Sequence, residues 1–178
     1  MAMNFSLYDA TLPSYLQVVG AVAGLLRKAE AFSTEKDLGD ALIQARLADD
    51  MLPFAYQVKE TAVHSLAALE GVRRGVFSPD QTVPPGDWPA LHQRIADTLA
   101  GLNAFPREEV ESFVGRPMRV VLPTRELAFT AENFLLSFSQ PNFYFHATTV
   151  YDLLRSRGVP LGKRDFLGRL RIERAASR

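Results

Sequence analysis

The amino-acid sequence predicts a mainly α-helical protein, a four-helix bundle with a small β-hairpin before the last long helix. Four long segments repeat apolar residues at helical spacing. Two short apolar stretches flank a Pro-Thr-Arg turn at residues 123–125, which is typical of a hairpin. The chain has 178 residues, 47% of them hydrophobic, so one domain with a real core is expected. We expect this domain to span residues 1–168, with a basic tail over 169–178.

The first two long helices are predicted over residues 12–31 and 51–73. Thr11 and the proline two residues later favour a helix start, because Thr can cap a helix and Pro suits its first turn. A short helix is expected around residues 38–47. Asp50 is the expected N-cap of the second long helix. Its apolar stripe consists of Phe54, Val58, Ala62, Leu66 and Leu69.

The second half of the chain contains the other two helices and the hairpin. Asp87 is expected to cap the third helix. The hairpin strands are predicted over residues 118–122 and 126–129. The fourth helix is predicted over 130–158, and Pro141 should kink it because proline lacks a backbone N–H donor.

Composition and charge exclude several function classes. The 20 basic and 20 acidic residues balance, which argues against a nucleic-acid partner. The absence of cysteine excludes disulfides, thiolate zinc sites and a Cys nucleophile. The longest apolar run, residues 18–26, is far shorter than the roughly 20 residues that span a bilayer, and residues 1–17 do not resemble a secretory signal. The sequence therefore predicts a cytoplasmic protein without a membrane partner.

Helical phase gives the three histidines different environments. At about 100° per residue, His146 points into the bundle, and Asn142 and Phe145 point the same way. His64 points instead towards solvent or a second interface. His92 flanks the apolar face of the third helix and has no ligand-type partner at helical spacing.

These phases predict a polar pocket around the histidine of the fourth helix. Its expected lining residues are Gln57, Thr61, Phe138, Asn142, Phe145 and His146. A buried imidazole needs hydrogen-bond partners, because an unsatisfied buried polar group costs about 1–3 kcal/mol. One interpretation is a divalent metal (Zn, Ni or Mn) held by His146, Asn142 and Gln57. The other is a satisfied polar cluster in a helical core, which the sequence favours because amides are weak ligands.

A different ligand set is also open. Glu60 and His64 are four residues apart, as are Asn142 and His146, and such pairs can chelate one ion. The helical wheel places Glu60 on the wrong face of its helix, which disfavours this set.

The fourth helix carries more aromatic residues than one face can bury. Counted at the same 100° per residue, Tyr144 and Tyr151 lie on the side of the helix opposite Phe145. An exposed aromatic edge is typical of a partner surface, and a homodimer is the expected partner. Packing of these side chains against the hairpin is the alternative.

Three segments resemble one known family. They are SLYDATLPSYL (6–16), ARLADDMLPFAYQV (45–58) and LPTRELAFTAENFLLSFSQPNFYFHATTVYDLLRSRGVPLGKRDFLG (122–168), and they resemble DUF1993, a domain of unknown function. That family is similar to the DinB-like superfamily of four-helix bundles, which implies the same bundle and frequent homodimers. The resemblance also implies a divalent metal held by three histidines in many members, some of which are metal-dependent thiol transferases or isomerases.

The resemblance carries over to this sequence only in part. In those members one histidine lies on the second helix, and the other two form an H-x-x-x-H pair on the last helix. The later histidine of this pair matches His146, the earlier one falls on Asn142, and the histidine of the second helix falls near Gln57. Three functions follow as hypotheses. The favoured one is a non-catalytic or small-ligand-binding homodimer with a degenerate metal site. The alternatives are a divalent-metal-dependent thiol transferase or isomerase, and a protein-interaction module.

Overall fold

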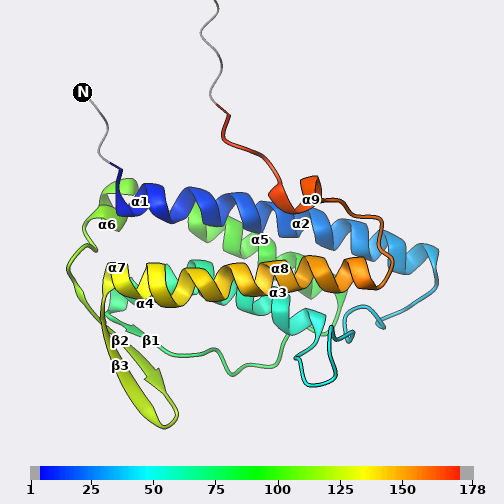
Figure 1. Cartoon of the computed structure of the whole chain (residues 1–178), viewed down its shortest axis with the longest axis horizontal. Helices are drawn as coiled ribbons and strands as arrows, with labels where there is room; N and C mark the ends of the chain where they lie inside the picture. Colours follow the sequence, from blue (N-terminus) through cyan, green and yellow to red (C-terminus); the bar gives the residue numbers. More distant parts are fainter. Residues whose placement is uncertain (1–4, 173–178) are drawn as a thin grey trace, which may run out of the picture.

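The computed structural model describes residues 5–172, which form four long helical rods and a small sheet (Figure 1). The rods, in chain order, are α2 (Leu12–Glu35), α3–η1–α4 (Phe54–Ala62, Val63–Ala67 and Ala68–Arg74), α5 (Trp88–Asn103) and α7–η2–α8 (Ala131–Asn133, Phe134–Ser139 and Gln140–Ser156). The segments η1 and η2 are π-helical. Short helices α1 (Leu7–Ala10), α6 (Arg107–Glu111) and α9 (Lys163–Leu167) flank the rods. The predicted mainly helical bundle is confirmed.

The rods pack around one apolar core. Helix α3 packs against α8 and α5, and α2 packs against α5 and α8, so each rod contacts at least two others. Tyr15, Phe54, Phe134 and Phe143 are among the largest fully buried side chains. In Figure 1, α8 lies in front of α3, and α9 lies beside α2.

The sheet has three strands, of which two form the expected hairpin. Strands β2 (Pro117–Leu122) and β3 (Arg125–Thr130) pair antiparallel, with Leu122 opposite Arg125 at the turn. The hairpin projects from the end of the bundle where α4 and α7 lie (Figure 1). The sequence did not predict β1 (Val76–Phe77), which pairs in parallel with β2.

The helix starts agree with the sequence in part. Asp87 caps α5, since its carboxylate accepts from the N–H of Ala90 at 2.8 Å. The expected cap at Asp50 is wrong, because α3 begins at Phe54 directly after an extended Pro53. The predicted short helix around residues 38–47 is also wrong, and this segment forms turns. Positive φ angles of 51° and 52° at residues 37 and 39 are incompatible with a continuing right-handed helix.

A π-helical segment lies just before Pro141, where the sequence predicted a kink. Segment η2 ends at Ser139, just before this proline, and α8 continues to Ser156. Proline donates no backbone hydrogen bond, and a wider π turn is one way to accommodate the missing bond.

Helix α3 is buried on almost every side. From Phe54 to Ser65 every residue is buried except Tyr56, which is half-buried. Beyond α5 and α8, the segment over residues 78–86, called the strap below, covers a further face. The buried Lys59 ammonium ties it down by donating to backbone carbonyls of the strap. Polar residues opposite the apolar stripe of α3 are therefore inside the protein.

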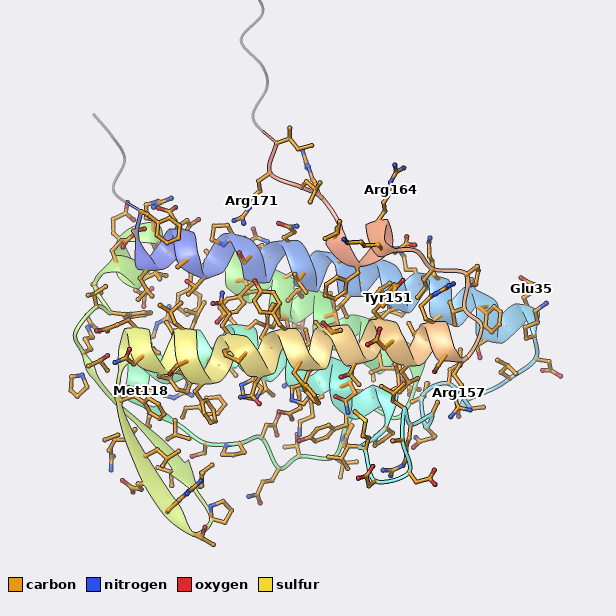
Figure 2. The ribbon with its side chains drawn as sticks, viewed as in Figure 1. Glu35, Met118, Tyr151, Arg157, Arg164 and Arg171 are labelled. Atoms are coloured by element: carbon orange, nitrogen blue, oxygen red, sulfur yellow. The ribbon has the colours of Figure 1, made fainter. Side chains whose placement is uncertain are left out.

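The carboxyl-terminal segment returns over α2. The Gln17 amide donates to the Leu167 carbonyl at 2.8 Å, and the Arg171 guanidinium donates to the Ser14 hydroxyl at 3.3 Å. Figure 2 shows Arg171 beside α2. Residues 173–178 of the predicted basic tail lie outside the described residues. Between residues 5 and 172, no helix combines the length and apolar character needed to cross a membrane.

Candidate functional site

Three potential metal ligands meet between α3, η1 and α8. Glu60, His64 and His146 each contribute one ligand atom, and these atoms all lie within 4.8 Å of one another. His64 Nε2 lies 3.7 Å from Glu60 Oε2. The His64 and His146 rings stack in parallel, with centroids 5.7 Å apart and planes 9° apart. All three side chains are buried, so this is a preformed polar cluster inside the bundle.

A glutamine on α3 fixes the proton of the His146 ring. The Gln57 Nε2 donates to the Leu52 carbonyl at 2.9 Å, which leaves Gln57 Oε1 facing His146 Nδ1 at 2.7 Å. Because an amide oxygen only accepts, His146 Nδ1 must carry the proton. The lone pair of His146 is therefore on Nε2. This is the arrangement by which a second residue commonly orients a metal-binding histidine.

Burial keeps both imidazoles neutral. Burial, together with the nearby His146 ring, lowers the pKa of His64 to about 3. Burial also lowers the pKa of His146 to about 4. Both rings therefore offer lone pairs at neutral pH, which is the form that binds metals.

The carboxylate of the cluster has an unusual environment. Burial raises the pKa of Glu60 to about 6, and the positive charge of Lys59 opposes part of this rise. The Lys59 ammonium lies 3.8 Å from Glu60 Oε1 and 3.3 Å from Asp80 Oδ1. Its shorter contacts are to the carbonyls of Asp80, at 2.6 Å, and Thr82, at 2.7 Å. Lys59 therefore bonds mainly to the carbonyls of the strap and neutralises Glu60 only in part.

A hollow of about 470 Å³ lies beside the cluster, between α3 and the strap. Its walls are formed by Leu52, Pro53, Tyr56, Lys59, Pro79, Asp80, Gln81, Thr82, Val83 and Pro84. Tyr56 connects it to the cluster, because its ring centroid lies 6.0 Å from that of His146. Burial, and then the negative charges of Glu60 and Asp80, raise the pKa of Tyr56. Its phenol therefore stays protonated at neutral pH.

The predicted pocket residues are distributed unevenly around this site. Gln57 and His146 meet directly. The Thr61 hydroxyl donates to the Gln57 carbonyl at 2.9 Å, and the Asn142 amide donates to the Phe138 carbonyl at 2.7 Å, each within its own helical rod. The Phe138 ring lies 6.0 Å from that of His64.

Phe145 does not point into the bundle as predicted. Its side chain is 57% exposed, and its ring lies 5.2 Å from that of His146 at a nearly perpendicular angle. It lines a second hollow of about 530 Å³ on the surface of α8, together with Tyr144. Phe145 directly precedes the inward-facing His146 in α8, so it lies about 100° away around the helix, at the edge of the buried face.

Tyr151 is not part of an exposed aromatic edge. It is half-buried, and its ring lies 5.9 Å from that of Phe166 in α9. Figure 2 shows Tyr151 on α8, on the side where α9 lies. Tyr144 remains 38% exposed. The neighbour that covers Tyr151 is therefore α9 and not the hairpin.

His64 and Glu60 are two further residues that sequence reasoning misplaced. His64 was predicted to face solvent or a second interface. The solvent alternative is wrong, since the side chain is only 7% exposed and its ring lies near those of Phe77 and Phe138. The helical wheel correctly placed Glu60 opposite the apolar stripe but treated that side as solvent. In the structure the side is covered, and Glu60 is 4% exposed. The four-residue spacing of Glu60 and His64 was the available signal.

Comparison with known proteins assigns a family. Residues 7–167 match DUF1993, described as a domain of unknown function. The chain belongs to the DUF1993 family. Among solved structures, this DUF1993 protein is similar to a DinB family member protein from Shewanella denitrificans, with 27% sequence identity and a TM-score of 0.79. That match covers 95% of this chain and 96% of the other, so the fold is DinB-like throughout. No curated protein matches.

The structure changes the candidate ligand set. The resemblance placed ligand positions at Gln57, Asn142 and His146. In this DUF1993 protein, the groups brought within 4.8 Å of one another are instead those of Glu60, His64 and His146. Gln57 lies next to this set and bonds the ring of His146. The third histidine, His92, pairs at 2.8 Å with Glu30 of α2.

Proposed function

We propose that this DUF1993 protein binds one divalent cation through Glu60, His64 and His146. The observation that carries the proposal is the convergence of three ligand atoms within 4.8 Å in a buried site. Two imidazoles and one carboxylate form a ligand set that suits Zn²⁺, and imidazole also suits Ni²⁺.

The unsatisfied polar atoms of the cluster support this fit. Among the described residues, Glu60 Oε1 and His64 Nδ1 are buried side-chain atoms with no hydrogen-bond partner. Such atoms cost about 1–3 kcal/mol each when nothing satisfies them. A cation bound by the carboxylate would compensate part of this cost. A purely structural polar core would instead be expected to satisfy its own groups.

Three protein ligands leave room for a fourth group, which is typical of catalytic rather than structural sites. A bound divalent ion would lower the pKa of a water or thiol that it contacts. Gln57 would hold the His146 tautomer, and the protonated phenol of Tyr56 would face a ligand in the adjacent hollow. We therefore propose a small organic molecule with a largely apolar body as the ligand of the 470 Å³ hollow. The enzymatic activity that fits this site is that of a metal-dependent thiol transferase.

The direct test is metal content and affinity. Protein purified without an affinity tag is expected to bind about one Zn²⁺, Ni²⁺ or Mn²⁺ per chain, and the ion should raise its melting temperature. His146→Ala and Glu60→Gln are expected to lose the ion. His92→Ala is the matched control, because this histidine pairs with Glu30 away from the cluster.

Asn142→Ala separates the two ligand sets. The set proposed here predicts that Asn142→Ala keeps the wild-type affinity while Glu60→Gln loses it. Loss of the ion in Asn142→Ala with retention in Glu60→Gln would restore the set predicted from the sequence. A wild-type protein that binds none of these ions would overturn the function itself.

We also propose that a second copy of the chain covers the 530 Å³ hollow on α8. The exposed apolar side chains there include Leu47 at 40%, Tyr144 at 38% and Phe145 at 57%. A contiguous exposed apolar patch is typical of an association surface. A two-fold pairing of α8 with its copy provides one, because each copy presents the same patch.

A further inference from the structure

The two π-helical segments are joined by one buried hydrogen bond. The Ser139 hydroxyl, at the end of η2, donates to the backbone carbonyl of His64 in η1 at 2.9 Å. Ser139 is fully buried and His64 is 7% exposed. This bond therefore links the backbone at His64, one proposed ligand, to the α7–η2–α8 rod, which carries a second proposed ligand, His146.

The carbonyl of His64 takes this partner because η1 departs from the α-helical pattern. In an α-helix the Ala68 N–H would bond to the His64 carbonyl four residues earlier. Here that N–H bonds to the carbonyls of Val63 and Ser65 instead. Buried backbone carbonyls rarely remain without a partner, so the Ser139 hydroxyl stabilises the π geometry at this point.

The positions of Ser139 and His146 make this arrangement effective. They are seven residues apart, which places them on nearly the same face of the α7–η2–α8 rod, two turns apart. That face packs against α3 and η1. The same helix face thus supplies a ligand and the donor that holds the backbone of His64. The outcome is the parallel stacking of the two rings at 5.7 Å.

We infer that Ser139 is a positioning residue for the proposed metal site, because its hydrogen bond fixes the π segment that brings His64 to Glu60 and His146. The inference rests on the proposed function. Ser139 itself contributes no ligand. It acts on the metal only through the backbone position of His64.

The test compares two serines in the same environment. Ser139→Ala removes the bond between the rods. Ser65→Ala is the matched control, because Ser65 is also fully buried but its hydroxyl donates to Thr61 and Ala62 within its own rod. The probe is Co²⁺, whose visible absorption reports ligand geometry. Ser139→Ala is expected to raise the Co²⁺ dissociation constant at least tenfold and to alter the spectrum, whereas Ser65→Ala should stay within about twofold of wild type.

A third variant separates position from stability. Ser139→Thr keeps the hydroxyl donor but adds a methyl group to a fully buried position, so it should bind Co²⁺ like wild type even if its melting temperature falls. Equal Co²⁺ affinity in Ser139→Ala and wild type would overturn the inference. Equal loss in both alanine variants would also overturn it, by showing a general packing effect.

A readout without metal distinguishes this inference from the proposed function. In the metal-free protein, NMR of the imidazole nitrogens should show changed His64 resonances in Ser139→Ala and unchanged ones in Ser65→Ala. If wild-type protein binds no Co²⁺ but the His64 resonances respond in this way, the metal function fails and the positioning of His64 by Ser139 stands. Unchanged His64 resonances in Ser139→Ala would reject that positioning role.

Discussion

The imidazole rings of His64 and His146 stack in parallel, 5.7 Å apart, although they belong to different helical rods. Two protonated rings at this separation would repel each other strongly in a site with little water. Burial disfavours even a single charged ring, so the stacked pair is most stable when both rings are neutral, which is also the state that binds a metal ion. The same protonation state, with both rings neutral, thus stabilises the metal-free protein and allows it to bind a cation.

The first prediction concerns the acid stability of the metal-free protein. The pKa of His64 is about 3 and that of His146 about 4 in the folded state, below the usual 6.5. Below pH 6.5 the unfolded chain binds these two protons and the folded chain does not, so acidification favours unfolding. Glu60 acts in the opposite direction, because its folded pKa of about 6 lies above 4.5. Near pH 5 these three groups leave about one net proton taken up on unfolding.

Urea unfolding in the presence of a chelator measures this effect. Between pH 6 and 5 these groups should lower the free energy of unfolding by roughly 1.4 kcal/mol per pH unit, the value for one proton. In Glu60→Gln the opposing contribution disappears, so the slope should approach twice that value. An identical slope in wild type and Glu60→Gln would contradict the elevated pKa of Glu60.

The second prediction concerns the hydrogen bond between Gln57 and His146. Gln57→Leu keeps the side-chain volume but leaves His146 Nδ1 without an acceptor, so metal affinity should fall about 10- to 100-fold. Gln57→Glu keeps an acceptor oxygen for His146 Nδ1 but loses the donor to the Leu52 carbonyl, so its metal affinity should lie between those of wild type and Gln57→Leu. Thr61→Val is the control, because its hydroxyl bonds only the backbone carbonyl of Gln57. Competition titrations with a zinc indicator would measure all three, and full affinity in Gln57→Leu would refute the assigned role.

Much of the fold could be predicted from local sequence patterns. Periodicity located the four rods, Asp87 marked the start of α5, and the residues around the 123–125 turn identified the hairpin. These features depend on neighbours in the chain. The strand β1 could not be predicted in this way, because its two residues pair with a strand far along the sequence.

The site could be predicted only in part, for a related reason. Phase identified the direction of His146, because the bundle core lies on that side of α8. Helical phase gives the direction of a side chain around its helix but does not show which segment packs against that side. It therefore failed for Glu60 and His64. The strap, held by Lys59, covers the far side of α3, and Phe77 of β1 packs against His64 in η1. The sequence gives no local sign of either contact.

The third prediction concerns the buried ammonium that holds the strap. Lys59→Met removes a donor from the Asp80 and Thr82 carbonyls and a counter-charge from Glu60 and Asp80. The free energy of unfolding should fall by about 2–4 kcal/mol. Lys28→Met is the matched control, because Lys28 forms an exposed pair with Asp165 whose loss should cost at most about 1 kcal/mol. Chemical denaturation at pH 7 would compare them, and equal losses would show that the strap does not depend on Lys59.

The fourth prediction concerns the proposed self-association through α8. Phe145→Glu places a charge on the exposed apolar patch, so a dimer formed there should dissociate with a dissociation constant raised at least 100-fold, since desolvating an unpaired charge is costly. Leu136→Glu tests specificity, because Leu136 is 42% exposed on the same rod but does not line the hollow.

Sedimentation velocity across a concentration series would give both dissociation constants. Because Phe145 also contacts the ring of His146 at 5.2 Å, metal affinity should be measured on the same samples. A monomeric Phe145→Glu that retains its metal would show that the patch serves association alone. A wild-type protein that is monomeric at every concentration, or dimers that persist equally in both variants, would reject α8 as the interface.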